Sequence, residues 1–303
     1  MKIILLLLVP CQLMIAQQTG DSSYSPVVNH PAYEKGDGPV IFIDEAHNNF
    51  HTMTGRYKPF ADLLEKDGYN VEPFQKSFTT DGLGEGKILV ISNALNERNT
   101  EEWTLPTPSA FTEQEIDQVE EWVKNGGSLF LIADHMPFPG AAGKLADRFG
   151  FELNNGFAFD TSGKAMSGVP ALFTKRDKTL NDCSVISGRN NSESVDSIYS
   201  FTGEAFRIPD DAIPVLILNK SFITLMPDTA WNFNETTPKI SAAGWSQGAI
   251  MKYGKGRVVI WGEAAMFSAQ TANGRKFGMN APYAKYNAQL LLNIIHWLDG
   301  NHG

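Results

Sequence analysis

The sequence predicts an α/β fold, a three-layer, doubly wound and mostly parallel sheet with an inserted accessory segment. Short apolar runs rich in β-branched residues alternate with amphipathic helical patterns, and several runs end on a polar residue. Parallel strands that are buried on both faces need continuous apolar runs of this kind. A strand, a helix and a further strand form a right-handed crossover, so the alternation predicts helices on both sides of one sheet.

The first half of the chain supplies the clearest elements. Strands are expected at 39–43, 70–74, 87–92 and 128–132. Helices are expected at 57–66 and 141–149, where apolar residues recur at helical spacing. A further helix opens at Thr112, because Thr112-Glu-Gln-Glu115 is a capping box, and it ends before Gly126.

The pattern weakens between 151 and 237, where Ser, Asn and Gly are frequent and 213–218 is the clearest strand. We interpret this stretch as an accessory insertion. The α/β pattern returns with a strand at 256–261 and a closing helix at 283–298. The predicted domain therefore spans 39–300.

The N-terminal residues 1–16 have the charged, apolar and small-residue order of a signal peptide, with cleavage expected after Ala16. The polar stretch 17–38 is expected to be a leader lying on the surface. These features predict a periplasmic or secreted protein. A lipoprotein anchored through Cys11 is the alternative, although Pro10 stands where that cleavage site prefers a small residue.

Composition excludes several classes of protein. The net charge is −9 and the 25 basic residues are scattered, so no basic stripe is available to bind nucleic acid. Loss of the signal peptide would leave Cys183 alone, which excludes a disulfide framework. No later apolar stretch approaches the roughly 18 residues of a membrane span, so no transmembrane segment is expected after signal removal.

Some short motifs match known families only in part. Asp44-Glu-Ala-His47 is the DEAH order of helicases, but no phosphate-binding loop precedes it. Ser246 lies in a Gly-x-Ser-x-Gly sequence, yet a hairpin is expected there instead of the strand-to-helix turn of serine hydrolases. His47 and His51 have the spacing of zinc peptidases, but Asn48 replaces the required glutamate.

Polar residues follow the carboxyl ends of several predicted strands, where open α/β sheets bind ligands. They are Asp44, Glu45, His47, Asn48 and His51 after the first strand, Asn93 after the third, Asp134 and His135 after the fourth, and Glu263 after the last. Each of these carboxylates could instead cap a turn, and each histidine could be structural. Three carboxylates at one edge would repel one another unless histidines or a cation intervene.

Oxygen and imidazole ligands without thiolates suit zinc or manganese. We therefore predict a divalent metal bound by the residues Asp44, His47, His51, Asp134 and His135. Glu45 or Glu263 would act as the catalytic base that takes a proton from a metal-bound water. This arrangement predicts a metal-assisted hydrolase of a periplasmic small molecule or glycan, and the alternative is a non-catalytic ligand-binding or scaffolding domain.

The same segments resemble the class I glutamine amidotransferase-like, flavodoxin-like superfamily, within it an uncharacterised bacterial exported branch related to trehalose-utilisation and gliding-motility accessory domains. The resemblance is carried by residues 44–51, 126–137, 188–189 and 256–270, with Asn287 and the terminal helix. It implies the fold over most of the mature chain. The amidotransferase cysteine is missing at Leu131-Ile-Ala-Asp-His135, so glutamine amidotransfer is not expected.

A small-molecule or glycan ligand would contact further polar residues. The predicted ligand-binding residues are Asn48, Asn93, Arg189 and Gln270. Arg189 lies in a turn-like Ser-Gly-Arg-Asn sequence, and its forked donors suit an anionic or hydroxylated ligand. An arginine on the surface without a ligand is the alternative for this residue.

Overall fold

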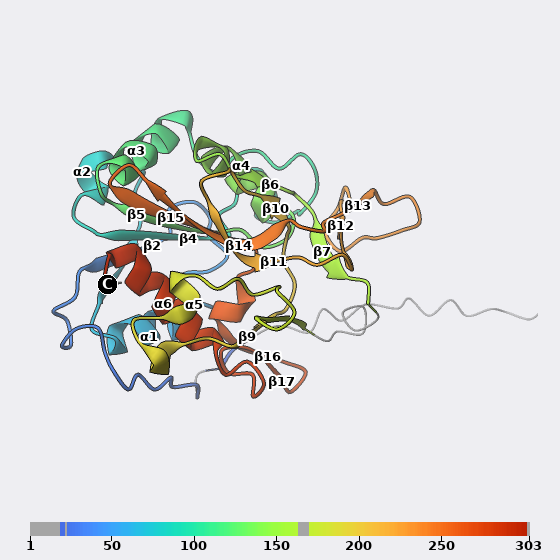
Figure 1. The fold of residues 1–303 in the computed structure, drawn as a ribbon. Coiled ribbons are helices and arrows are strands. Elements are labelled where there is room, and N and C mark those ends of the chain that lie inside the picture. Colours follow the sequence, from blue (N-terminus) through green and yellow to red (C-terminus); the bar gives the residue numbers. More distant parts are fainter. Residues whose placement is uncertain (1–18, 22, 163–169, 302–303) are drawn as a thin grey trace, which may run out of the picture.

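The computed structural model describes residues 19–21, 23–162 and 170–301. The predicted signal peptide, residues 1–16, lies outside these residues. The chain forms a mixed α/β fold around a central sheet of nine strands (Figure 1). Within the described residues, no helix is both long and apolar enough to cross a membrane.

The core of the central sheet is parallel. Its adjacent parallel strands, in spatial order, are β3 (Asn70–Phe74), β2 (Val40–Asp44), β4 (Ile88–Ser92), β5 (Ser128–Ile132) and β15 (Gly256–Trp261). All the strands predicted from apolar runs in the first half of the chain are present, and the strand expected at 256–261 pairs with β5. Their carboxyl ends therefore open on one edge of the sheet.

The other side of the sheet is antiparallel. It consists of β14 (Ser246–Tyr253), β11 (Ile213–Ile217), β10 (Phe206–Arg207) and β6 (Glu152–Leu153). β14 and β15 form a hairpin, so Ser246 lies on a strand and not on a nucleophile turn. Residues from 151–237 thus extend the main sheet as well as forming accessory layers.

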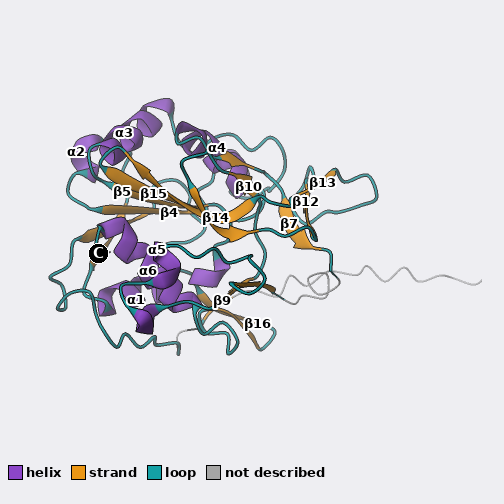
Figure 2. Ribbon diagram, in the orientation of Figure 1, coloured by secondary structure: helices purple, strands orange, loops and turns teal. Residues whose placement is uncertain are grey.

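Helices lie on both sides of the central sheet (Figures 1 and 2). One side holds α1 (Lys58–Lys66), α5 (Ser184–Ser187) and α6 (Asn287–Asp299); the other holds α2 (Thr80–Leu83), α3 (Glu113–Lys124) and α4 (Phe138–Arg148). Alternate residues of each strand face the two sides. Phe130 packs in the cluster with α1 and α6, whereas Leu129 and Leu131 pack in the cluster with α3 and α4.

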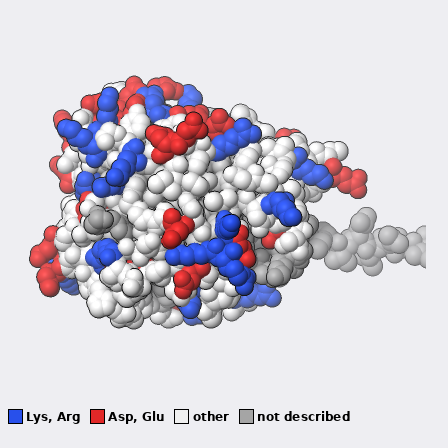
Figure 3. All heavy atoms as spheres, in the orientation of Figure 1, with Lys and Arg blue, Asp and Glu red and all other residues white. Residues whose placement is uncertain are grey.

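Three small sheets surround the central one. They are β7 (Phe157–Asp160) with β12 (Phe222–Leu225) and β13 (Lys239–Ser241); β8 (Ala171–Thr174) with β9 (Ser197–Ser200); and β1 (Thr19–Gly20) with β16 (Ala269–Ala272) and β17 (Arg275–Gly278). Short 3-10 helices span η1 (Glu97–Asn99), η3 (Asn191–Glu193) and η4 (Ala265–Phe267). Basic and acidic side chains lie close together on the face drawn in Figure 3.

Element boundaries differ from the expectation mainly at helix starts. The capping box at Thr112 and Glu115 is confirmed, with both reciprocal hydrogen bonds formed. α4 begins at Phe138 instead of 141, since proline in its first turn needs no hydrogen-bond partner. α6 begins at Asn287 instead of 283, because Ala284 and Asn287 form separate turns before it.

Candidate functional site

The carboxyl ends of β2, β4, β5 and β15 lie at one edge of the sheet, as expected, but their polar side chains form separate groups. β4 lies between β2 and β5. The end of β2, where Asp44 lies, is therefore two strand spacings, about 10 Å, from the end of β5. Asp134 and Glu263 follow adjacent strands and interact electrostatically. The edge therefore contains an Asp44 group and an Asp134–Glu263 group.

Asp44 is neutralised by His47. The Nδ1 atom of His47 lies 2.9 Å from both carboxylate oxygens of Asp44, and its Nε2 atom lies 3.1 Å from Oε1 of Glu115. Burial opposes protonation of His47, but the hydrogen bonds and charges of Asp44 and Glu115 outweigh it and raise the pKa of the imidazole. His47 thus links the loop after β2 to the first turn of α3.

Asp134 and Glu263 accept hydrogen bonds from nearby backbone amides. Asp134 accepts from the N–H groups of His135 and Ala264, and Glu263 accepts from those of Ala265 and Met266 in η4. Burial and the charge of Asp134 together raise the pKa of Glu263 well above its usual value. Its surroundings therefore favour the protonated form of Glu263 more than water does.

Glu204 is a third buried carboxyl beside this pair, and sequence reasoning did not single it out. Its side chain is fully buried, and the backbone of Asn154 lies near enough to favour its charged form but makes no well-formed hydrogen bond to its oxygens. Burial raises its pKa well above the usual value, and the charge of Asp134 adds to the shift. No strand-end pattern marks this position, because the backbone contact between Glu204 and Gly262 is made across distant parts of the chain.

The remaining histidines of the edge have different surroundings. His51 is buried against Tyr57, its Nδ1 atom lies 3.2 Å from the hydroxyl of Ser92, and burial lowers its pKa to about 3. His135 stacks on Phe157 at a centroid distance of 4.5 Å and meets the edge of Trp231 at 4.6 Å. Its Nδ1 atom lies 2.8 Å from the carbonyl oxygen of Met136.

The five predicted metal ligands do not share one centre. His47 is held between two carboxylates, His51 faces Ser92 and Tyr57, and His135 lies in an aromatic cluster. Among residues 19–21, 23–162 and 170–301, no group of three or more His, Cys, Asp or Glu side chains could hold a metal ion. As arranged, the five predicted ligands do not form a zinc or manganese site.

The other predicted site residues make structural contacts. Glu45 accepts from the backbone of Met53 and from Gln75, Asn48 donates to the carbonyl of Leu95, and Asn93 accepts from the amide of Asp134. Gln270 donates to Ser268. Arg189 pairs with Glu193 at 2.7 Å and donates to the carbonyl of His30, beside α6 and away from the strand ends. Asn93 therefore contacts Asp134, as a site residue would. Arg189 contacts neither the Asp44 group nor the Asp134–Glu263 group.

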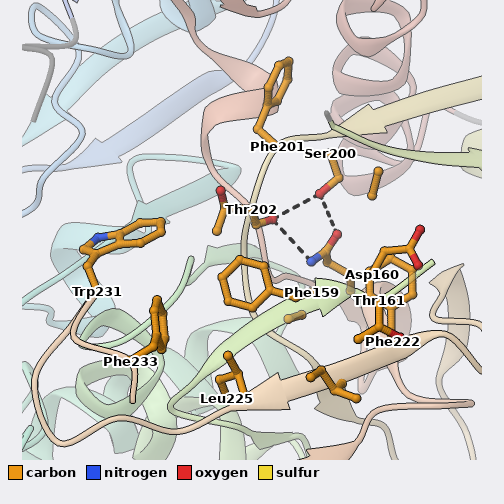
Figure 4. A pocket seen from close by; sticks show the side chains of 14 residues that line it. Phe159, Asp160, Thr161, Ser200, Phe201, Thr202, Phe222, Leu225, Trp231 and Phe233 are labelled. Atoms are coloured by element: carbon orange, nitrogen blue, oxygen red, sulfur yellow. Dashed lines mark hydrogen bonds between the residues drawn. The ribbon is translucent and has the colours of Figure 1, made fainter. Parts of the chain in front are cut away.

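A pocket of about 440 Å³ opens between β7, β12 and the segment that follows β9. Its aromatic lining consists of Phe159, Phe201, Phe222, Trp231 and Phe233. Its polar lining consists of Asp160, Thr161, Ser200, Thr202 and Gln247. In Figure 4 the rings of Trp231 and Phe233 lie next to Phe159, and a dashed line joins Ser200 to Thr202.

This pocket adjoins the Asp134–Glu263 group. The backbone amide of Phe201 favours the charged form of Glu263, and Gly203 packs so tightly that a Cβ atom there would lie 2.1 Å from the carbonyl oxygen of Gly262. Trp231, on the opposite wall, contacts His135, the residue after Asp134. Sequence reasoning missed the pocket because its walls come from segments separated by tens of residues and lack strand-end polar residues.

Among the comparisons with solved structures, the likeness to the mmIFT52 N-terminal domain supports the fold. The chain is 14% identical to the mmIFT52 N-terminal domain, with a TM-score of 0.58 over 86% of this chain and 96% of that one. It is 12% identical to cytoplasmic protein STM1381 from Salmonella typhimurium LT2, with a TM-score of 0.49 over 86% and 98%. It is 11% identical to a protein described as ThuA-like from Bacteroides uniformis, with a TM-score of 0.47 over 90% and 94%. No family model and no curated protein matches the sequence.

Proposed function

We propose that this chain is a non-catalytic, small-molecule-binding domain of the flavodoxin-like, amidotransferase-like type, and that its ligand occupies the pocket beside Glu263. The observation that carries the proposal is the pocket itself. Its volume of about 440 Å³ and its lining of aromatic side chains with a few polar groups are typical of small-molecule sites. Open α/β sheets bind ligands beside the carboxyl ends of their strands, and this pocket includes Phe201, whose backbone amide contacts Glu263 after β15.

The carboxylates at the sheet edge already form hydrogen bonds within the protein, which favours ligand binding over catalysis as the function. Asp44 is paired with His47, and Glu263 accepts two backbone amides. None of the predicted catalytic or metal-binding side chains lines the pocket. A general base must reach the proton that it removes, and these carboxylates are committed to the fold around them.

A pocket-filling substitution tests the proposal. Ala171 lines the pocket, whereas its neighbour Leu172 is 46% exposed and lies outside it, so Ala171→Trp and Leu172→Trp form a matched pair. A library of sugars, aromatic compounds and common metabolites is screened for a rise in the melting temperature. We expect compounds that stabilise the native protein and Leu172→Trp but not Ala171→Trp.

The screen contradicts the proposal if no compound distinguishes the two variants. Phe233→Ala, which enlarges the pocket without filling it, serves as a second variant if Ala171→Trp does not fold. It should weaken the response to the same compounds. Circular dichroism at equal concentration confirms that each variant is folded.

A further inference from the structure

We propose that Arg56 binds the carboxylate group of a small organic ligand at the carboxyl edge of the sheet. Arg56 lies in the segment between β2 and α1, just before the helix begins. Loops that follow parallel strands gather at this edge, where open α/β sheets bind ligands. Arg56 does not line the pocket beside Glu263, so this second site is separate from the proposed one and does not depend on it.

The guanidinium of Arg56 has no carboxylate partner in the described part of the chain. Its Cζ atom lies 3.9 Å from the centroid of the Phe50 ring, a cation–π contact. Its Nε atom is buried and donates to no described residue. The two terminal nitrogens also lack a hydrogen bond or ion pair to these residues, but they are not enclosed as Nε is. They are therefore available to donate to an anion from outside the chain.

A partly buried guanidinium without a counter-charge is costly. Burial lowers the pKa of Arg56, and no carboxylate among the described residues raises it. Burial also opposes the charged form of Arg189, but the hydrogen bonds and charge of Glu193 outweigh burial there and raise the pKa of Arg189. A bound anion would do for Arg56 what Glu193 does for Arg189.

The surroundings of Arg56 favour an organic carboxylate. The fork of a guanidinium matches the two oxygens of one carboxylate, with two parallel hydrogen bonds. Phe50 meets Trp103 at a centroid distance of 5.5 Å, and both rings are only partly buried. Their outer surfaces can cover the apolar body of a ligand. A free phosphate ion has no apolar body, and it would lose hydration beside these rings without compensation.

Arg257 offers a matched comparison within the same chain. Its Cζ atom lies 5.6 Å from the centroid of the Trp297 ring, and its Nε atom is also buried without a described partner. Arg257 lies at the amino end of β15, however, which is the opposite edge of the sheet from the loops that follow the strands. The two arginines share a stacked environment and differ in their place on the sheet, so Arg257 serves as the control.

Titration with benzoate, followed by proton–nitrogen NMR of the arginine Nε–H groups at constant ionic strength, tests the proposal. The resonance of Arg56 is assigned by its loss in Arg56→Lys. We expect this resonance to shift and saturate with a Kd on the order of 1 mM, while the resonance of Arg257 stays unchanged. Benzamide, which has nearly the same shape but no charge, should cause no shift. Inorganic phosphate should bind more weakly than benzoate.

Thermal melting gives a second readout that needs no assignment. Benzoate at a concentration well above its Kd should raise the melting temperature of the native protein and of Arg257→Gln, but not that of Arg56→Gln. Arg56→Lys keeps the charge and lacks the fork, so it should show a smaller rise than the native protein. It also replaces Arg56→Gln if that variant does not fold.

Three results would overturn the proposal: an Arg56 resonance that benzoate leaves unchanged, an equal shift with benzamide, or an equal loss of the thermal response in Arg257→Gln and Arg56→Gln. Phosphate that binds as tightly as benzoate would overturn the carboxylate class. Ligand binding beside Glu263 is tested separately, by the comparison of Ala171→Trp with Leu172→Trp.

Discussion

At the scale of single residues, the structure shows how buried ionisable groups at the sheet edge are kept stable. Charges that cannot reach water are either paired or protonated. Asp44 is paired with His47, whereas burial raises the pKa of Glu204 and of Glu263 and so favours their protonated forms. Carboxylates that looked like metal ligands in the sequence therefore need no cation to be buried.

The His47 contacts predict a large stability effect. His47→Ala removes the partner of the fully buried Asp44 and one partner of Glu115. Breaking a buried pair from one side leaves an uncompensated charge, so we expect a loss of about 3 kcal/mol in the free energy of unfolding. Urea denaturation at pH 7 measures it. The double variant with Asp44→Asn should recover part of the loss, and no recovery would contradict the role of the pair.

Replacing Glu204 should stabilise the protein, unlike replacing His47, and the size of the effect should depend on pH. Because its pKa is raised in the folded state, the folded protein holds a proton that the unfolded chain releases above its ordinary pKa. Stability is therefore lost as pH rises from about 4.5 toward the folded pKa. Glu204→Gln should remove this dependence and be more stable than the native protein at pH 8, by on the order of 1 kcal/mol.

Urea denaturation at pH 5 and pH 8 measures the Glu204 effect. The advantage of Glu204→Gln should be larger at pH 8 than at pH 5. Glu235→Gln, an exposed residue, serves as the control and should show no such difference. An equal effect of Glu204→Gln at both pH values would show that Glu204 does not carry a raised pKa.

At the scale of elements, α3 connects local and long-range structure. Thr112 accepts from the amide of Glu115, and the Glu115 side chain reaches back to Thr112 and across to His47. These contacts, with burial opposing them, lower the pKa of Glu115 to about 2. Thr112, which caps α3, thus helps to position Glu115 for its contact with His47 in the loop after β2.

Thr112→Ala should cost about 1 kcal/mol in the free energy of unfolding, the usual effect of losing an N-cap side chain. Thr112→Ser keeps the hydroxyl and should cost clearly less. Chemical denaturation of both variants measures the difference. Equal losses would indicate that the threonine methyl group, and not the cap, is responsible.

At the scale of the whole molecule, two expectations concern the N-terminal segment and the metal content. We propose that residues 1–16 are removed, so the mature chain should begin at Gln17. Mass spectrometry of protein recovered from the native host tests this. A lipid-modified start at Cys11 would favour the lipoprotein alternative, and a chain that retains Met1 would contradict export.

Metal content tests the hydrolase alternative. Protein purified without chelator should contain less than stoichiometric zinc or manganese, because the predicted ligands are separated and paired with other groups. Elemental analysis and thermal melting with added zinc, manganese or calcium are the measurements. One metal per chain, with a higher melting temperature on loading, would favour the metal-assisted hydrolase.

Periodicity and capping signals in the sequence were enough to predict the main strands and helices and the parallel direction of the strands. Apolar runs at 70–74, 128–132 and 256–261 became strands with these bounds, and the capping box opened α3. Their parallel pairing placed Asp134 and Glu263 at neighbouring strand ends, whereas Asp44, expected beside them, is paired separately with His47. Such features depend on periodicity and on contacts between residues three or four positions apart, which a sequence displays directly.

Which polar groups meet, and where the pocket forms, depends on the packing of distant segments. Glu115 lies 68 residues from His47 in the sequence, and the local pattern around neither residue predicts their contact. The pocket depends on Phe159, Thr202, Trp231 and Gln247, which lie on four separate segments. Pairing between distant segments is set by the packing of the whole core, so the same strand-end residues could have shared a metal or, as here, been buried apart.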